Sequence, residues 1–121
     1  MSRILLIDDD EMTLMMLRTI LSDAGYAVTA TADGPRGIDL YKELRPELVL
    51  LDVGLPGMSG MQVLRELRTF DREANVIVIS GYTSKASVNE ATKYGARQFI
   101  EKPVDGKKLI ETVRQFLMNP E

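Results

Sequence analysis

The stretch Arg3-Ile-Leu-Leu-Ile-Asp-Asp-Asp-Glu11 is an apolar run that ends in four acidic residues. Leu48-Val-Leu-Leu-Asp52 and Val76-Ile-Val-Ile-Ser80 follow the same design, with an unbroken apolar run and then a polar side chain. Apolar runs that do not alternate with polar residues are typical of strands buried on both faces, as in a parallel sheet. The three stretches therefore predict three inner strands of one parallel sheet.

Helical patterns with turn residues at their ends separate these strands. Capping residues such as Asp33, Ser59 and Asp105 indicate where helices begin, and Gly25 and Pro46 indicate where two of them end. Two short strands are expected near Ala27 to Ala30 and around Phe99-Ile100. The expected helices run from about Met12 to Ala24, from Asp33-Gly-Pro35 to the residue before Pro46, from the capping box Ser59-Gly-Met-Gln62 through Val63, Leu64 and Leu67, through Val88 and Ala91 to Gly95, and from Asp105 through Leu109, Ile110, Val113 and Leu117.

Strand and helix patterns alternate five times over residues 1–121, which predicts a single α/β domain. Strict alternation with short links gives a parallel sheet covered by helices on both faces, with right-handed crossovers. Five units are too few to close an eight-stranded barrel. The simplest solution is a five-stranded, doubly wound, flavodoxin-like (β/α)5 sheet with strand order 2-1-3-4-5.

The composition is that of a soluble globular protein, with 45% hydrophobic and 27% charged residues. No apolar run approaches the roughly 20 residues of a membrane span, and Ile4 to Ile7 is too short for a secretory signal, so we expect a cytoplasmic protein without membrane contact. The net charge is −3 without a basic cluster, which argues against direct nucleic-acid binding. The chain has no cysteine and no histidine, so its chemistry has to use carboxylates, hydroxyls and lysines.

Polar side chains end four of the five predicted strands. Asp8 and Asp9 follow the first strand, Asp52 ends the third, Ser80 ends the fourth and Lys102 follows the fifth. Open α/β sheets bind ligands outside the carboxyl ends of their strands, so all five side chains are expected at one crevice. A single carboxylate in such a place often only caps a helix, and this is the role expected of the next two acids, Asp10 and Glu11. The combination of acids, a hydroxyl and a lysine predicts a functional site.

Clustered carboxylates repel one another and become tolerable when a cation neutralises them. Oxygen ligands without histidine or cysteine favour Mg²⁺, which commonly completes its coordination with phosphate oxygens. A carboxylate can itself attack phosphorus and form an aspartyl phosphate when cations stabilise the transferring group. Lys102 would supply a second cation, and Ser80 could donate a hydrogen bond to the phosphoryl group once it is attached.

Four motifs resemble those of receiver domains in bacterial two-component response regulators, and together they extend over nearly the whole chain. They are Leu6-Ile-Asp-Asp9, Leu50-Leu-Asp-Val-Gly-Leu-Pro-Gly-Met-Ser-Gly60, Ile79-Ser-Gly81 and Glu101-Lys-Pro103. Each motif alone is weak, but the four in this order are specific.

The resemblance implies that Asp52 accepts a phosphoryl group from the phosphohistidine of a sensor histidine kinase or phosphotransfer protein. It also implies that Asp9, Asp52 and the Gly54 carbonyl ligate Mg²⁺, with Asp8 acting largely through bound water. Phe99 occupies the place of a switch aromatic that turns inward when the Ser80 hydroxyl moves toward the phosphate. The surface of the fourth helix, fifth strand and fifth helix would then change and control a downstream protein or an output domain. Such a domain would assist its own phosphorylation and dephosphorylation but would not be a turnover enzyme.

Three local features differ from the family pattern or allow two interpretations. Ser59 stands where the family frequently has aspartate, and serine caps a helix equally well. Tyr82 is bulky, and we expect it either to shield the phosphoryl group from water, so that Tyr82→Ala shortens its lifetime, or to be a surface aromatic. The fourth helix has two competing starts, Ser84 and the capping box Ser87-Val-Asn-Glu90, which suggests a segment that frays and responds to phosphorylation.

Other functions remain as alternatives with weaker support. A phosphatase with an aspartyl nucleophile usually carries a second aspartate two residues later, where this chain has Gly54. A nucleotide or flavin binder needs a glycine-rich or hydroxyl-rich loop after the first strand, where this chain has four acids. A receiver-like interaction module that is never phosphorylated is the third alternative. Composition does not decide between a stand-alone regulator and the front part of a longer protein.

Overall fold

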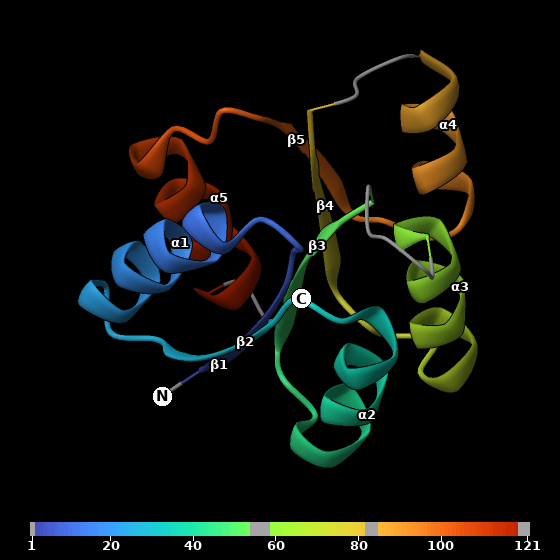
Figure 1. Ribbon diagram of the computed structural model, residues 1–121, viewed down its shortest axis with the longest axis horizontal. Coiled ribbons are helices and arrows are strands. Elements are labelled where there is room, and N and C mark those ends of the chain that lie inside the picture. The colour runs from blue at the N-terminus through green and yellow to red at the C-terminus, as the bar shows by residue number, and fades with distance from the viewer. Residues whose placement is uncertain (1, 54–58, 82–84, 119–121) are drawn as a thin grey trace.

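The computed structural model describes residues 2–53, 59–81 and 85–118 (Figure 1). Strands and helices alternate along these residues, as the sequence predicts. The elements are β1 (Arg3–Ile7), α1 (Glu11–Asp23), β2 (Ala27–Thr31), α2 (Gly34–Leu44), β3 (Leu48–Asp52), α3 (Gly60–Phe70), β4 (Val76–Ser80), α4 (Lys85–Lys93), β5 (Gln98–Glu101) and α5 (Gly106–Met118).

The strands form one parallel sheet in the order β2-β1-β3-β4-β5, which confirms the predicted fold class. Helices α1 and α5 cover one face, and α2, α3 and α4 cover the other (Figure 1). Because successive side chains of a strand point to opposite faces, the two apolar layers take alternate residues of the same strands. Leu5 and Ile7 of β1 pack with α2 and α3, whereas Ile4 and Leu6 pack with α1 and α5.

The helix ends agree with the predicted ones to within one or two residues. Asp33 Oδ2 accepts a hydrogen bond from the Arg36 N–H at 2.8 Å, and Ser59 Oγ accepts one from the Gln62 N–H at 3.2 Å. Helix α1 begins at Glu11, one residue before the predicted start, because Asp10 is its N-cap, and it ends at Asp23, one residue before the predicted end. Side-chain capping of this kind provides an acceptor for one of the N–H groups that have no hydrogen-bond partner within the first turn of a helix.

The last two helices also follow the sequence pattern. Asp105 caps α5 through hydrogen bonds from the N–H groups of Lys107 and Lys108, at 3.0 and 3.4 Å. In α4, Ala91 is buried and Val88 is partly buried. The chain is already helical at Lys85, so Ser87 lies inside the helix and does not start it. The competing start at Ser84 lies outside the described residues. No helix among the described residues is both long enough and apolar enough to cross a bilayer.

Candidate functional site

The predicted site residues gather at the carboxyl edge of the sheet. Asp8 and Asp9 directly follow β1, Asp52 and Ser80 are the last residues of β3 and β4, and Lys102 directly follows β5. Parallel strands end on the same side, and the register pairs Asp52 with Ile79, so Ser80 lies one residue beyond that pair. The unbroken apolar runs bury the strands up to this edge of the sheet. The polar residue that follows each run is therefore held at the carboxyl end of its strand.

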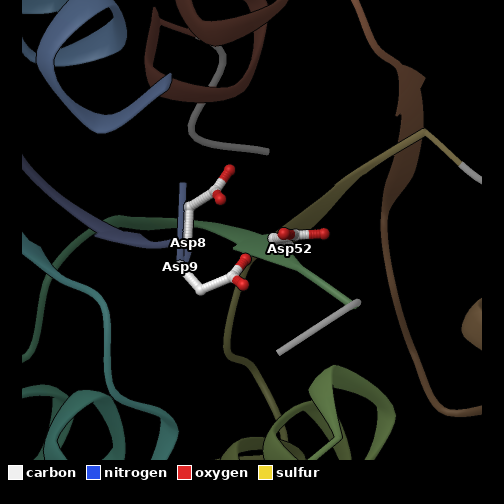
Figure 2. A group of neighbouring side chains, drawn as sticks. All are labelled: Asp8, Asp9 and Asp52. Atoms are coloured by element: carbon white, nitrogen blue, oxygen red, sulfur yellow. The ribbon is translucent and has the colours of Figure 1, made fainter. Parts of the chain in front are cut away.

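Three carboxylates converge there (Figure 2). One oxygen from each of Asp8, Asp9 and Asp52 lies within 4.8 Å of the others. Asp8 and Asp52 are buried, with 3% and 7% of their surface exposed, whereas Asp9 is open to solvent. Three oxygen donors at this spacing, one of them accessible, fit a hard divalent cation that keeps part of its water shell. The acidic group can therefore hold a metal ion.

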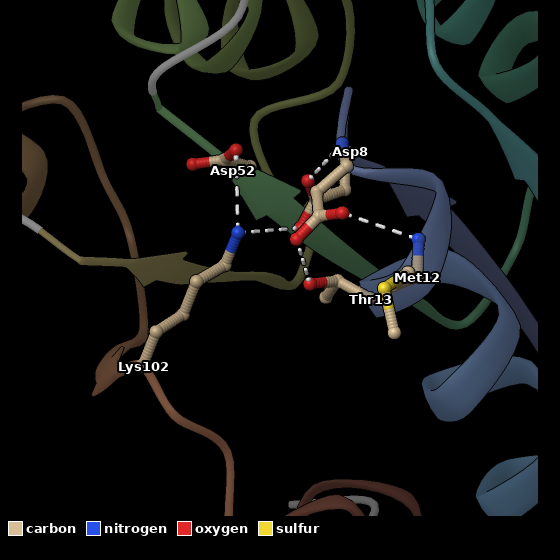
Figure 3. A network of polar contacts seen from close by, with 6 residues as sticks. Asp8, Met12, Thr13, Asp52 and Lys102 are labelled. Atoms are coloured by element: carbon tan, nitrogen blue, oxygen red, sulfur yellow. Dashed lines mark hydrogen bonds and ion pairs between the residues drawn. The ribbon is translucent and has the colours of Figure 1, made fainter.

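The Lys102 ammonium lies against two of these carboxylates (Figure 3). Its Nζ is 3.0 Å from Asp8 Oδ2 and 3.5 Å from Asp52 Oδ2. Burial by itself lowers the pKa of Lys102, but the hydrogen bond to Asp8 and the negative charges of Asp8 and Asp52 outweigh it, so the pKa is raised. Lys102 is therefore a fixed positive charge at neutral pH. Its backbone N–H also donates to the Ser80 carbonyl at 2.9 Å, which ties the lysine to the end of β4.

Asp10 links the pocket to α1. It is the N-cap of α1, as predicted, because its Oδ1 accepts from the Met12 N–H at 3.1 Å and its Oδ2 accepts from the Thr13 hydroxyl at 2.7 Å. The hydrogen bond from Thr13 is the main reason that the pKa of Asp10 is lowered. Glu11 is the first helical residue and not a cap.

The sequence reasoning missed a second contact of Asp10, since its own N–H donates to Asp8 Oδ1 at 2.9 Å. Aspartate side chains commonly accept a hydrogen bond from the N–H two residues later, so the spacing of Asp8 and Asp10 carried this signal.

The remaining predicted site residues are placed as follows. Ser80 is 1% exposed at the end of β4, and Phe99 of β5 is partly buried beside the α2–α4 layer. The register pairs Phe99 with Val78, two residues before Ser80. Gly54 and Tyr82 lie outside the described residues, so the metal contact and the shielding predicted for them stay predictions.

Gly60 is a further site residue that sequence reasoning did not single out. Its N–H donates to the Val53 carbonyl at 3.2 Å, so the start of α3 approaches the end of β3 closely. A Cβ atom at position 60 would overlap Val53 Cα and the Asp52 carbonyl oxygen. Glycine is therefore required for α3 to begin beside Asp52.

Comparison with known proteins gives one consistent family. A family model described as the response regulator receiver domain matches residues 4–114. The chain is 38% identical to Protein CcdB of Bacillus subtilis over 97% of this chain and 98% of that protein. It is 37% identical to the chemotaxis protein CheY of Thermotoga maritima, over 93% and 95% of the two chains. In a CheX-CheY-BeF3-Mg²⁺ complex from Borrelia burgdorferi, the matched chain superposes with a TM-score of 0.89 at 32% identity, over 94% of this chain and 87% of that one.

Proposed function

The chain belongs to the response regulator receiver domain family, and on that premise we propose that Asp52 accepts a phosphoryl group from a phosphohistidine of a histidine kinase or phosphotransfer protein. The observation that carries the proposal is the convergence of Asp8, Asp9 and Asp52 beside the Lys102 ammonium. An ion pair that served only the fold would need one carboxylate for one lysine. The excess of negative charge instead matches a site that is completed by a cation and a phosphoryl group.

In the proposed step an oxygen of the Asp52 carboxylate attacks phosphorus. The new O–P bond forms as the P–N bond to the donor imidazole breaks, and the electron pair of that bond stays on the imidazole nitrogen. Phosphoryl transfer depends mainly on positioning and on stabilisation of the charge on the phosphoryl oxygens. Lys102 lies 3.5 Å from Asp52 Oδ2, so a positive charge is already next to the position of the transferred group.

Asp8, Asp9 and Asp52 are the described residues that would hold Mg²⁺, together with the carbonyl predicted at Gly54. When bound, the ion would neutralise the carboxylates and the phosphoryl oxygens. The CheX-CheY complex from Borrelia burgdorferi was solved with BeF3 and Mg²⁺, which supports the same ion here. The protein is proposed to be a phosphoacceptor and not a turnover enzyme, since position 54 offers no side chain to act as a general acid.

The output surface is proposed to be that of α4, β5 and α5. A groove of about 480 Å³ lies on the β5–α5 side and is lined by residues that include Phe99, Lys102 and Leu109. Lys102 lines this groove and also contacts Asp52. A change of charge at Asp52 would therefore act directly on a residue of this surface. A downstream protein, or an output domain in a longer chain, would read the change.

The donor is proposed to approach along α1. Met12 and Met15 are 80% and 70% exposed on the helix that begins directly beside the pocket. Exposed methionines form an adaptable apolar surface of the kind used to bind partners. A histidine-bearing protein packed on this surface would lie next to Asp52.

The proposal is tested by incubating the protein with Mg²⁺ and either acetyl phosphate or a phosphorylated histidine kinase, followed by mass mapping. We expect a phosphoryl adduct on Asp52, lost in Asp52→Asn and kept in the distant control Asp71→Asn. No adduct with either donor would overturn the proposal and favour the interaction module that is never phosphorylated. Met15→Glu should slow transfer from the kinase and leave the reaction with acetyl phosphate unchanged, because only the protein donor needs the α1 surface.

A further inference from the structure

We propose that Asp10 is a positioning residue for the acidic pocket, because its carboxylate, held by Thr13, fixes the turn that directs its own N–H at Asp8. The inference rests on the proposed function only in taking the pocket as the Mg²⁺ site. It assigns to Asp10 a role beyond that of a helix cap.

Two different parts of the chain hold the Asp8 side chain. Its Oδ1 accepts from the Asp10 N–H at 2.9 Å, and its Oδ2 lies 3.0 Å from Lys102 Nζ. The side chain is buried, so its carboxylate cannot exchange these donors for bulk water. Each oxygen is therefore directed by a different part of the chain, and among the described residues loss of the Asp10 donor would leave Lys102 to orient Asp8.

Asp10 is itself held by hydrogen bonds to the first turn of α1. Its backbone is extended, with φ −88° and ψ 108°, between the end of β1 and the first turn of α1. Both carboxylate oxygens accept hydrogen bonds from α1, Oδ1 from the Met12 N–H and Oδ2 from the Thr13 hydroxyl. Its carbonyl accepts from the Leu14 N–H at 3.0 Å. The side chain thus attaches the turn to the helix, and this attachment sets the direction of the Asp10 N–H.

A matched control exists at the start of α2. Asp33 is also an N-cap with an extended backbone, at φ −113° and ψ 125°, and its side chain accepts from Arg36. The Asp33 N–H, however, donates to the Thr31 hydroxyl at 3.2 Å and not to a pocket carboxylate. The two aspartates share the capping role, and only Asp10 is linked to the site.

The test is a Mg²⁺ titration by calorimetry of the full chain and of Asp10→Ala, Asp10→Asn, Thr13→Val and Asp33→Ala. Groups that orient metal ligands typically change affinity by about 10-fold to 100-fold when removed, so Asp10→Ala should weaken Mg²⁺ binding about tenfold. Thr13→Val should weaken it less. Asp10→Asn should bind nearly as the parent does, because asparagine caps a helix as well as aspartate. Asp33→Ala should bind as the parent does although it also loses a cap.

A second readout does not depend on the metal. In the metal-free protein, Asp10→Ala and Thr13→Val should speed hydrogen exchange of the residue 10 amide and shift the NMR signal of the Lys102 ammonium. Asp33→Ala should leave both signals in place. These signals report on the Asp8 contacts even if Asp52 is never phosphorylated, so failure of the proposed function and failure of this inference give different results.

Two results would overturn the inference. If Asp10→Ala behaves as Asp33→Ala in both experiments, Asp10 is a helix cap and nothing more. If Asp10→Asn loses as much Mg²⁺ affinity as Asp10→Ala, the contribution of Asp10 is its negative charge and not its position.

Discussion

The two edges of the sheet use carboxylates in opposite ways. At the carboxyl edge, Asp8, Asp9 and Asp52 lie close together, and the Lys102 ammonium contacts Asp8 and Asp52. At the amino edge, the carboxylate of Asp71, in the link between α3 and β4, has several donors. Its Oδ2 accepts from the Tyr41 hydroxyl at 2.7 Å and lies 3.6 Å from Arg45 Nη1, while its Oδ1 accepts from the Glu73 N–H at 3.0 Å.

The protonation equilibria at the amino edge follow from these contacts. The hydrogen bond from Tyr41 is the main cause that lowers the pKa of Asp71. Burial, and then the hydrogen bond to Asp71, raise the pKa of Tyr41. The Phe70 ring packs edge-on against the Tyr41 ring. Its centroid is 5.2 Å from Lys42 Nζ and 4.9 Å from Arg45 Cζ. The negative charge is matched locally, so this edge contributes to the stability of the fold.

An excess of like charge therefore distinguishes the functional edge of the sheet, and cavity size does not. A hollow of about 780 Å³ opens at the amino edge and is lined by residues that include Tyr41, Arg45 and Asp71. It is larger than the groove near Lys102, yet the described part of the chain brings no cluster of potential metal ligands to it. The carboxyl edge instead keeps its acids close together at the expense of stability, because repulsion between them is relieved only by added positive charge.

The largest difference in stability between the two edges is expected from Lys102→Met. Removing the ammonium leaves two buried carboxylates without their cation, which should lower the free energy of unfolding by about 3 kcal/mol in metal-free buffer. Saturating Mg²⁺ should recover much of the loss, because the ion replaces the missing charge. Urea unfolding with and without Mg²⁺ measures both values, and the exposed Lys107→Met is the control. An equal loss in both buffers would show that Lys102 does not share its carboxylates with a cation.

A slightly smaller effect is expected from the metal itself. At a hundredfold excess over its dissociation constant, Mg²⁺ should raise the free energy of unfolding by about 2.7 kcal/mol. Asp9→Ala should lose most of that gain, and in metal-free buffer it should be slightly more stable than the parent, since one of the repelling charges is gone. Glu73→Ala, at the amino edge, should keep the full gain. If Asp9→Ala and Glu73→Ala respond alike to Mg²⁺ in thermal unfolding, the two edges do not differ as described.

The smallest effect concerns the amino edge. Tyr41→Phe removes a hydrogen bond to a charged group and should lower the free energy of unfolding by about 1.5 kcal/mol at neutral pH. This loss should be the same with and without Mg²⁺, because Asp71 and the pocket lie at opposite edges of the sheet. A loss that depended on Mg²⁺ would contradict the separation of the two edges.

The same variant gives a pH dependence with a defined sign. The pKa of Asp71 is lowered in the folded protein from its ordinary value of 3.8, so as the pH falls through 3.8 the unfolded chain binds the proton first. The stabilisation by Asp71 is therefore present above pH 3.8 and is lost as the pH falls toward the folded pKa. In urea unfolding from pH 7 to pH 3, the free energies of unfolding of the parent and of Tyr41→Phe should converge in acid. A difference that stayed constant with pH would contradict a stabilisation that depends on the ionised Asp71.

The five β–α units, the strand order and the edge at which Asp8, Asp9, Asp52 and Lys102 meet could all be predicted from the amino-acid sequence. These features depend on local patterns and on one general rule. Apolar runs mark buried strands, capping residues mark helix starts, and parallel strands end on the same side of a sheet. The helix ends differ by one or two residues because a cap can be read from sequence only to that precision.

The contacts between individual atoms could not be predicted in this way and are seen in the folded protein. The Tyr41–Asp71 hydrogen bond joins residues 30 apart, and the overlap that a side chain at position 60 would cause with β3 depends on where α3 packs against the sheet. The Lys102 contacts with Asp8 and Asp52 join three strand ends far apart in the chain. Such contacts are set by how helices and strands pack around a shared core, and periodicity along the sequence holds no record of that packing.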